Sequence, residues 1–119
     1  MSSDPNCIFC KIVDGKIPAR KIYEDDELIG FHDIAPWAPV HFLLVPKRHI
    51  ASMAQLTQED AALMGKIMTL APSLAVENGC RPYPDGGYRV VVNTGVEGGQ
   101  EVHHLHVHVM GGPRPWLKG

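Results

Sequence analysis

The chain has 119 residues, of which 45% are hydrophobic and 20% charged, and its formal net charge is −2. This length and composition are typical of one compact domain, and a near-neutral charge without a basic stripe argues against nucleic-acid binding. No apolar run approaches the roughly 20 residues that span a bilayer, and the first residues lack the pattern of a signal peptide, so we predict a cytoplasmic protein without membrane partners.

The first half of the sequence predicts a short helix and three strands. Residues 7–13 favour one or two helical turns that end at Gly15. Residues 20–24 and 28–32 are strand-like runs separated by an acidic turn. Residues 41–45 form a continuous apolar run, which is typical of a strand buried on both faces.

The second half predicts one long helix and two further strands. Residues 57–60 resemble a capping box, and the helix that follows is expected to end near 78–79, with Pro72 kinking or shortening it. The strands are predicted at 88–93 and 104–110. The apolar stripe of the helix comprises Leu63, Ile67, Leu70, Ala71 and Leu74. These elements together indicate an α+β domain built on an antiparallel sheet of about five strands.

Four of the seven histidines lie between His103 and His108. Side chains alternate along a strand, so His104, His106 and His108 share one face. The side chains between them then face the core: Leu105, Val107 and Val109. A row of three imidazoles could be a solvated polar face or a metal site. It also suits phosphate chemistry, because imidazole titrates near pH 7 and can attack phosphorus or bind a phosphate group.

Several motifs resemble one known family, the histidine-triad (HIT) superfamily. Residues 98–112 resemble its His-φ-His-φ-His signature (φ, hydrophobic), where glycines bring backbone amides close to the histidines. Residues 31–36 and 41–49 are similar to the Hint branch, the histidine-triad nucleotide-binding proteins, and residues 7–12 and 15–18 agree with it.

The resemblance extends over residues 7–112 of a single domain, 1–119, and leaves 113–119 as a tail expected to lie across a surface. It implies the HIT-like fold, with a short N-terminal helix and a sheet that continues across a homodimer. The helical stripe then supplies either part of the dimer interface or only the core of one protomer. Trp116 in the tail is expected to border the neighbouring active site.

The resemblance also implies a role for each catalytic histidine. His106 occupies the position of the nucleophile, which attacks the α-phosphate to give a nucleotidyl-histidine that water then hydrolyses. His108 hydrogen-bonds the phosphate, His104 supports the array, and His41 lies close to the nucleophile and helps to set its protonation.

A nucleoside pocket is implied likewise. Asp33 matches the carboxylate that accepts the ribose hydroxyls. The positions that sandwich the purine are Ile8, Phe9, Ile12, Ile17, Phe31, His32 and Ile34. The phosphate side comprises Asn93, Gly99, Gln100 and Glu101, together with His106 and His108. Glu101 departs from well-known members that carry Ser there, and a carboxylate repels phosphate unless it is protonated or turned away.

The function that the resemblance implies is hydrolysis of purine nucleoside phosphoramidates, with AMP or GMP as the nucleotide, and slower hydrolysis of acyl-adenylates. It implies no organic cofactor. Two alternatives stay open: a dinucleoside polyphosphate hydrolase or nucleotidyl transferase, and a nucleotide-binding regulatory or scaffold protein.

The three cysteines do not suggest a disulfide framework, because their number is odd and no secretory signal precedes them. Cys80 is read as a small apolar residue. Cys7 and Cys10 form a C-x-x-C pair, and with His49 and His104 they make the Cys₂His₂ set of a closed structural zinc site. Some bacterial members of the superfamily use these positions for zinc. The alternative is two buried thiols beside two polar histidines.

Overall fold

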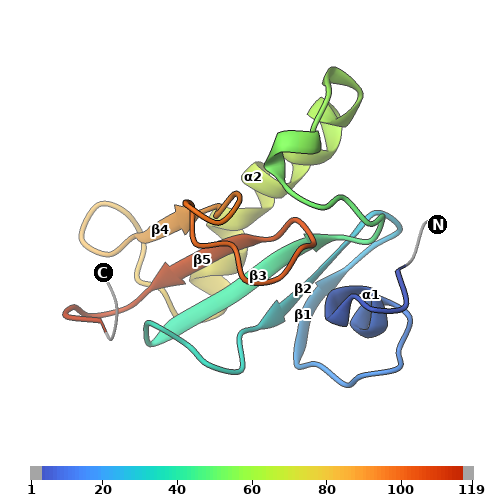
Figure 1. The fold of residues 1–119 in the computed structure, drawn as a ribbon. Coiled ribbons are helices and arrows are strands. Elements are labelled where there is room, and N and C mark those ends of the chain that lie inside the picture. Colours follow the sequence, from blue (N-terminus) through green and yellow to red (C-terminus); the bar gives the residue numbers. More distant parts are fainter. Residues whose placement is uncertain (1–3, 117–119) are drawn as a thin grey trace.

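The computed structural model describes residues 4–116 as one twisted five-stranded antiparallel sheet with a helix on each face (Figure 1). Its strand order is β1-β2-β3-β5-β4. In chain order, the elements are α1 (Ile8–Val13), β1 (Lys21–Glu24), β2 (Leu28–His32), β3 (Val40–Pro46), the 3₁₀ turns η1 (Met53–Gln55) and η2 (Gln58–Asp60), α2 (Ala61–Glu77), β4 (Tyr88–Val91) and β5 (Val107–Gly111). The predicted α+β class, with one long and one short helix, is confirmed.

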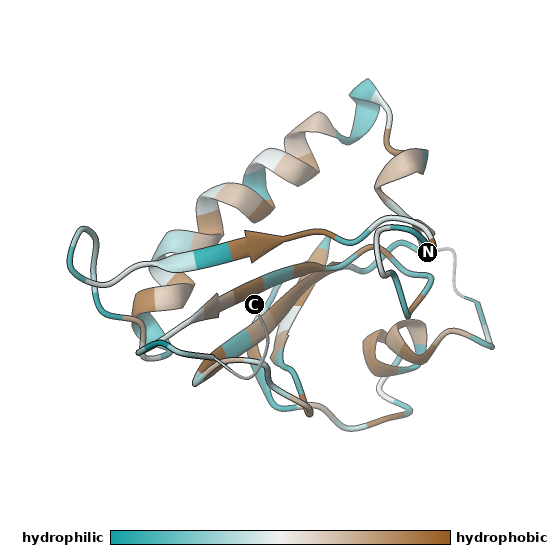
Figure 2. Cartoon of the chain, turned by 60° about the vertical axis from the view of Figure 1, so that its left-hand side comes forward, coloured by the Kyte–Doolittle hydropathy of each residue, from teal (hydrophilic) through white to brown (hydrophobic). Residues whose placement is uncertain are grey.

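The sheet separates two apolar clusters. The strand β3 alternates between them: Phe42 and Leu44 pack beneath α2, whereas Leu43 and Val45 pack with α1 on the opposite face. The prediction that this strand is buried on both faces is therefore confirmed. In Figure 2 the central strands and α1 are mostly hydrophobic, whereas α2 alternates between hydrophobic and hydrophilic residues, as a helix with one face on a sheet should.

The apolar stripe of α2 belongs to the core of the protomer. Leu63, Ile67 and Leu74 are buried against the sheet, and Leu70 is half-buried beside them. Of the two roles predicted for this stripe, the structure shows the one within the protomer. Exposed apolar side chains of α2 are instead Met68 and Val76.

The long helix begins as predicted but is not shortened. Thr57 and Asp60 form the reciprocal capping box, and Asp60 also pairs with Arg48. Pro72 lies inside α2 without ending it, so of the two predicted effects, a kink or a shorter helix, the shortening is wrong. Pro72 is exposed, and the carbonyl that loses its helical donor belongs to exposed Met68, where water can replace the bond.

The last strand is shorter than predicted at its start. It covers Val107–Gly111 rather than 104–110, because the backbone before it bonds to the segment that follows β3. The N–H of Leu105 donates to the carbonyl of Ile50 at 2.7 Å instead of joining the ladder. The alternation nevertheless persists, with Leu105 and Val107 in the core beneath α2.

β4 also ends early, at Val91 rather than at 93. The side chain of Asn93 donates to the carbonyl of Gly98 at 2.7 Å and so begins a loop. No helix in the described part of the chain combines the length and apolarity needed to cross a membrane.

Candidate active site

A pocket of about 310 Å³ lies on the α1 face of the sheet, and His106 and His108 line it. Its volume lies at the lower end of the range for small-ligand sites. Of the residues that the sequence assigned to the nucleotide, all but Gln100 line this pocket: Ile8, Phe9, Ile12, Ile17, Phe31, His32, Asp33, Ile34, Asn93, Gly99, Glu101, His106 and His108. Six further residues line the pocket that the sequence did not predict there: Pro18, Ala19, Ala35, Trp37, Leu43 and Val102.

The hydrogen bonds of His106 leave it a free lone pair. Its Nδ1 lies 2.7 Å from the carbonyl oxygen of His104, which can only accept. Nδ1 therefore carries the proton, and in the neutral ring Nε2 holds an unshared electron pair. The Phe9 ring packs nearly perpendicular to the imidazole, with centroids 5.0 Å apart and 85° between the planes, and restrains its orientation. The geometry thus suits His106 as a nucleophile.

Two successive hydrogen bonds, from Trp37 to His41 and from His41 to His108, determine which nitrogen of His108 carries the proton. The backbone N–H of Trp37 donates to Nδ1 of His41 at 3.0 Å, so His41 cannot carry a proton there. His41 then holds its proton on Nε2 and donates it to Nδ1 of His108 at 2.9 Å. His108 is left with a proton on its own Nε2. His108 lines the pocket, so this N–H is a donor for a phosphate oxygen.

Burial keeps these two rings neutral. Desolvation, assisted by the positive charges that His106 and His41 would carry, lowers the pKa of His108 from 6.5 to about 4. Desolvation also lowers the pKa of His41, although the Asp33 carboxylate, 3.5 Å from its Nε2, opposes this effect. The indole of Trp37 stacks on His108 with an angle of 15° between the ring planes and helps to hold it in place. Trp37 could be inferred from sequence only as an aromatic residue in the loop between Asp33 and His41.

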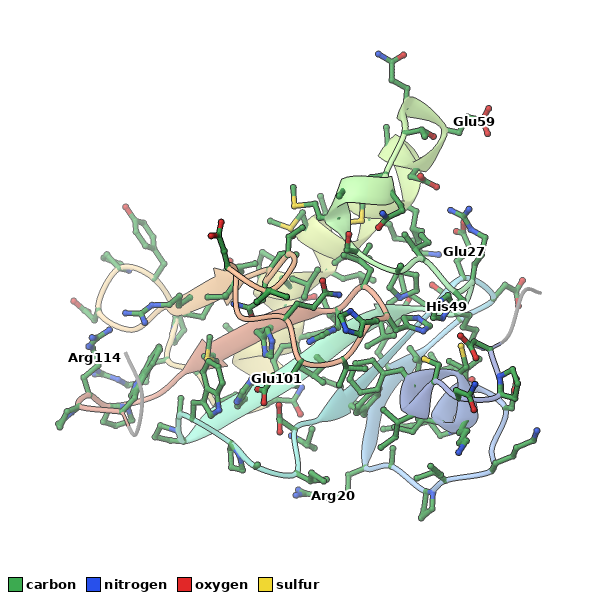
Figure 3. The ribbon with its side chains drawn as sticks, viewed as in Figure 1. Arg20, Glu27, His49, Glu59, Glu101 and Arg114 are labelled. Atoms are coloured by element: carbon green, nitrogen blue, oxygen red, sulfur yellow. The ribbon has the colours of Figure 1, made fainter. Side chains whose placement is uncertain are left out.

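Gln100 holds the loop rather than lining the pocket. Its amide nitrogen donates to the carbonyls of Ala51 and Val102 at 2.8 and 3.1 Å, and its oxygen accepts from the N–H of Gly95. The structure therefore does not bring the Gln100 side chain to the expected phosphate position. In Figure 3 the loop that carries Glu101 crosses in front of the sheet. Glu101 is exposed and lines the pocket.

A second group of side chains gathers between α1 and the sheet. Cys7, Cys10, His49 and His104 place their donor atoms within 4.8 Å of one another. Nδ1 of His104 lies 3.2 Å from the sulfur of Cys7, and Nδ1 of His49 lies 3.3 Å from that of Cys10. Figure 3 shows His49 near α1, beside the sulfur atoms. A tetrahedral zinc ion with ordinary bond lengths separates sulfur and nitrogen ligands by about 3.6 Å, so this set fits zinc.

The main chain prepares His104 for such a site. Its Nε2 lies 2.7 Å from the carbonyl oxygen of Pro46, so Nε2 carries the proton and the Nδ1 lone pair faces the sulfurs. His104 is fully buried. The structure therefore separates His104 from the pocket, while its carbonyl still orients His106.

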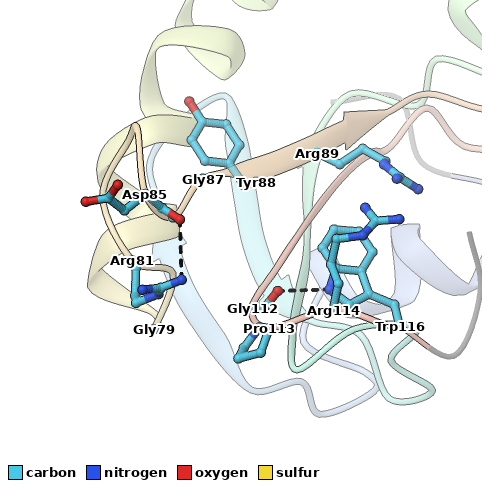
Figure 4. A pocket seen from close by; sticks show the side chains of 11 residues that line it. Gly79, Arg81, Asp85, Gly87, Tyr88, Arg89, Gly112, Pro113, Arg114 and Trp116 are labelled. Atoms are coloured by element: carbon cyan, nitrogen blue, oxygen red, sulfur yellow. Dashed lines mark hydrogen bonds between the residues drawn. The ribbon is translucent and has the colours of Figure 1, made fainter.

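A larger hollow of about 670 Å³ lies away from the histidines, between β4 and the C-terminal tail (Figure 4). The guanidinium carbons of Arg89 and Arg114 lie there at 4.9 and 5.0 Å from the centre of the Trp116 ring. Its indole N–H donates to the carbonyl of Gly112. The tail thus lies across the surface beside β4, as expected for residues 113–116, whereas 117–119 fall outside the described residues. The described lining of this hollow contains no imidazole and no thiol.

The protein-family profile described as "Scavenger mRNA decapping enzyme C-term binding" matches residues 6–117. Protein HitA of Neisseria gonorrhoeae is 48% identical over 108 residues, which span 91% of this chain and 97% of that protein. A HIT-like protein of Synechococcus elongatus is 46% identical over 112 residues, 94% of this chain and 93% of its own length.

Solved structures agree with these sequence relatives. A HIT family hydrolase from Legionella pneumophila superposes with a TM-score of 0.84 at 43% identity, covering 92% of this chain and 95% of that one. A histidine triad protein from Clostridium difficile gives a TM-score of 0.87 at 39% identity, covering 96% of both chains.

The fold and the buried histidines beside a pocket define a histidine-triad protein. With these relatives, the chain belongs to the HIT family.

We expect acid to destabilise the protein through His108. In the unfolded chain His108 binds a proton with a pKa near 6.5, whereas in the folded protein its pKa is about 4. Between these values the unfolded chain binds more protons, so the free energy of unfolding falls as pH drops. Urea unfolding at about pH 7 and about pH 4.5 measures this loss, which should be smaller in His108→Asn. Equal losses in both proteins would contradict the assignment.

Proposed function

We propose that the protein is a member of the Hint branch that hydrolyses purine nucleoside phosphoramidates, and acyl-adenylates more slowly, through a nucleotidyl-His106 intermediate. The observation that carries the proposal is the opposite protonation of the two pocket histidines. His106 offers a lone pair at Nε2, whereas His108 offers an N–H. A nucleophile and a phosphate donor are the two groups that a displacement at phosphorus requires.

In the first step, Nε2 of His106 attacks the α-phosphorus and forms a P–N bond to the imidazole. The bond from phosphorus to the amine breaks, and the departing nitrogen keeps the electron pair and takes a proton from solvent water. The ring gains positive charge as it attacks. The carbonyl oxygen of His104, which accepts a hydrogen bond from Nδ1–H of His106 over 2.7 Å, stabilises that charge.

The negative charge that builds on the phosphoryl oxygens meets the N–H of His108. In the second step, water attacks the same phosphorus and loses a proton to solvent. The bond to His106 breaks, its electron pair returns to Nε2, and the nucleoside monophosphate leaves. The apolar end of the pocket, formed by Phe9, Ile12 and Phe31 among others, suits the purine. Asp33 retains lone pairs for the ribose hydroxyls beyond the one that accepts from the N–H of Ala35.

Replacing His106 tests this mechanism. His106→Ala should lower the turnover of an adenosine phosphoramidate by more than about a thousandfold, because no other group replaces the nucleophile. His103→Ala is the matched control, since His103 is exposed and does not line the pocket. Mass spectrometry of acid-quenched wild-type protein should detect the nucleotidyl adduct, and His106→Ala should lack it. Undiminished turnover in His106→Ala would overturn the proposal and favour an incidental activity of a nucleotide-binding scaffold.

We also propose that the Cys7, Cys10, His49 and His104 cluster holds a structural zinc ion. The support is the donor set, its spacing and the orientation of both Nδ1 atoms toward the sulfurs. The ion would supply a cross-link between α1 and the sheet. It would thereby hold the wall of the nucleoside pocket that Ile8, Phe9 and Ile12 provide.

Metal analysis tests the zinc site. Protein purified without added metal should contain about one zinc ion per chain, and Cys10→Ser should contain almost none. Cys80→Ser is the control, because Cys80 is also buried but lies outside the cluster. Zinc removal should lower the melting temperature of the wild type and leave that of Cys10→Ser nearly unchanged. A metal-free wild type would exclude the site.

A homodimer is the further part of the proposal. β4 stands at the edge of the described sheet, so its outer side can pair with a second copy, and exposed Met68 and Val76 on α2 offer apolar surface. Trp116 lies beside Arg89 of this same strand, so in such a dimer it would approach the partner. Sedimentation equilibrium should report twice the chain mass at micromolar concentration. A monomer mass would contradict the proposal.

A further inference from the structure

The pocket differs from an ordinary phosphate site in its charges. Proteins usually hold phosphate with arginine or lysine. The described lining of this pocket contains neither residue and contains two carboxylates, those of Asp33 and Glu101. Outside this lining, the positive charge of Arg20 lies close enough to His32 to add to the effect of burial, which lowers the pKa of that imidazole. The pocket therefore carries two formal negative charges before a substrate enters.

This charge disfavours polyanionic substrates. A nucleoside phosphoramidate carries a single negative charge at its phosphoryl group, which the N–H of His108 can accommodate. Each additional phosphate would bring another negative charge into a pocket whose described lining offers no arginine or lysine to balance it.

The two carboxylates are not equivalent. Asp33 is engaged within the protein, because one oxygen accepts from the N–H of Ala35 and the other lies 3.5 Å from Nε2 of His41. Among residues 4–116, no hydrogen bond or ion pair engages the side chain of Glu101, which is exposed. Asp33 is thus held in place for the ribose, and Glu101 is the pocket carboxylate that no described protein group engages.

Its position suits the leaving group. The apolar part of the lining, which includes Phe9 and Phe31, suits the nucleoside, and the departing group must leave toward solvent. Glu101 is an exposed part of the lining, on the loop that leads directly to the histidines (Figure 3). A carboxylate here attracts a positive charge carried by the departing amine and repels a negative one.

We propose that Glu101 is a specificity-determining residue that recognises a cationic leaving arm, so that the preferred substrates are nucleotides joined to amines or amino acids carrying an additional positive charge. This inference rests on the proposed function, since it concerns the leaving group of that reaction.

Three adenosine phosphoramidates of alkylamines test the inference. Their arms have equal length and differ only in the terminal group: ammonium, hydroxyl or carboxylate. For wild-type protein, kcat/KM should be on the order of tenfold higher for the ammonium arm than for the carboxylate arm. The reason is that the exposed carboxylate of Glu101 attracts the first arm and repels the second. Raising the salt concentration should reduce this ratio.

The variant Glu101→Gln should reduce the ratio to about twofold or less, because it keeps the shape and removes the charge. Glu97→Gln is the matched control: it removes the same charge from an exposed residue of the same loop that does not line the pocket, and should keep the wild-type ratio. An unchanged ratio in Glu101→Gln, or a wild type that does not discriminate the arms, would overturn the inference.

Binding separates this inference from the proposed function. The dissociation constants of the three compounds, measured by calorimetry on His106→Ala with and without Glu101→Gln, should show the same charge preference and the same loss. If no compound is hydrolysed by the wild type but the dissociation constants still follow Glu101, the proposed reaction fails and the recognition by Glu101 stands. If hydrolysis proceeds without any charge preference in rate or binding, only the inference fails.

Discussion

The site depends on the apolar anchoring of the segment that leads into β5. Leu105, Val107 and Val109 are buried beneath α2, so the histidines that alternate with them must project from the opposite face. The pairing of His108 with Leu43 of β3 holds this register. A slip by one residue would bury the imidazoles under α2 and place apolar side chains in the pocket. The core under the helix thus determines where the chemistry lies.

Hydrogen bonds then give three identical side chains three different roles. His104 donates to the carbonyl of Pro46 and turns Nδ1 to the cysteines, whereas His106 donates to the carbonyl of His104 and keeps Nε2 free. His108 accepts at Nδ1 and presents an N–H. In each ring a hydrogen bond occupies one nitrogen and thereby assigns the function of the other. Because the carbonyl of His104 orients His106, the cysteine cluster and the pocket are coupled through a single residue.

Sequence periodicity predicted the face of the histidines but not where the ladder stops. The alternation of apolar and imidazole residues is local, and it holds even where the chain leaves the sheet. The start of β5 at Val107, rather than at His104, depends on the carbonyl of Ile50, which reaches Leu105 only in the folded chain. Similarly, the contact of Gln100 with Ala51 joins two distant loops, so its role in the loop could not be derived from the motif around it.

The cysteine cluster could be predicted more from the types of its ligand side chains than from their spacing in the sequence. Cys7 and His104 lie 97 residues apart in sequence, and no periodic pattern connects them. The set was inferred because two thiolates and two imidazoles complete a known ligand combination, and the fold does bring them together. Trp37 had no such signal, since its contribution is made jointly by its ring and its backbone.

The hydrogen bond from Trp37 to His41 has a consequence for how this protein can vary. The donor is a peptide group, so the proton arrangement of two buried imidazoles does not depend on the side chain at position 37. Every amino acid except proline supplies that N–H. The indole, against which His108 stacks as a wall of the pocket, can therefore change during evolution. The backbone N–H would still determine which nitrogen atoms of His41 and His108 carry a proton.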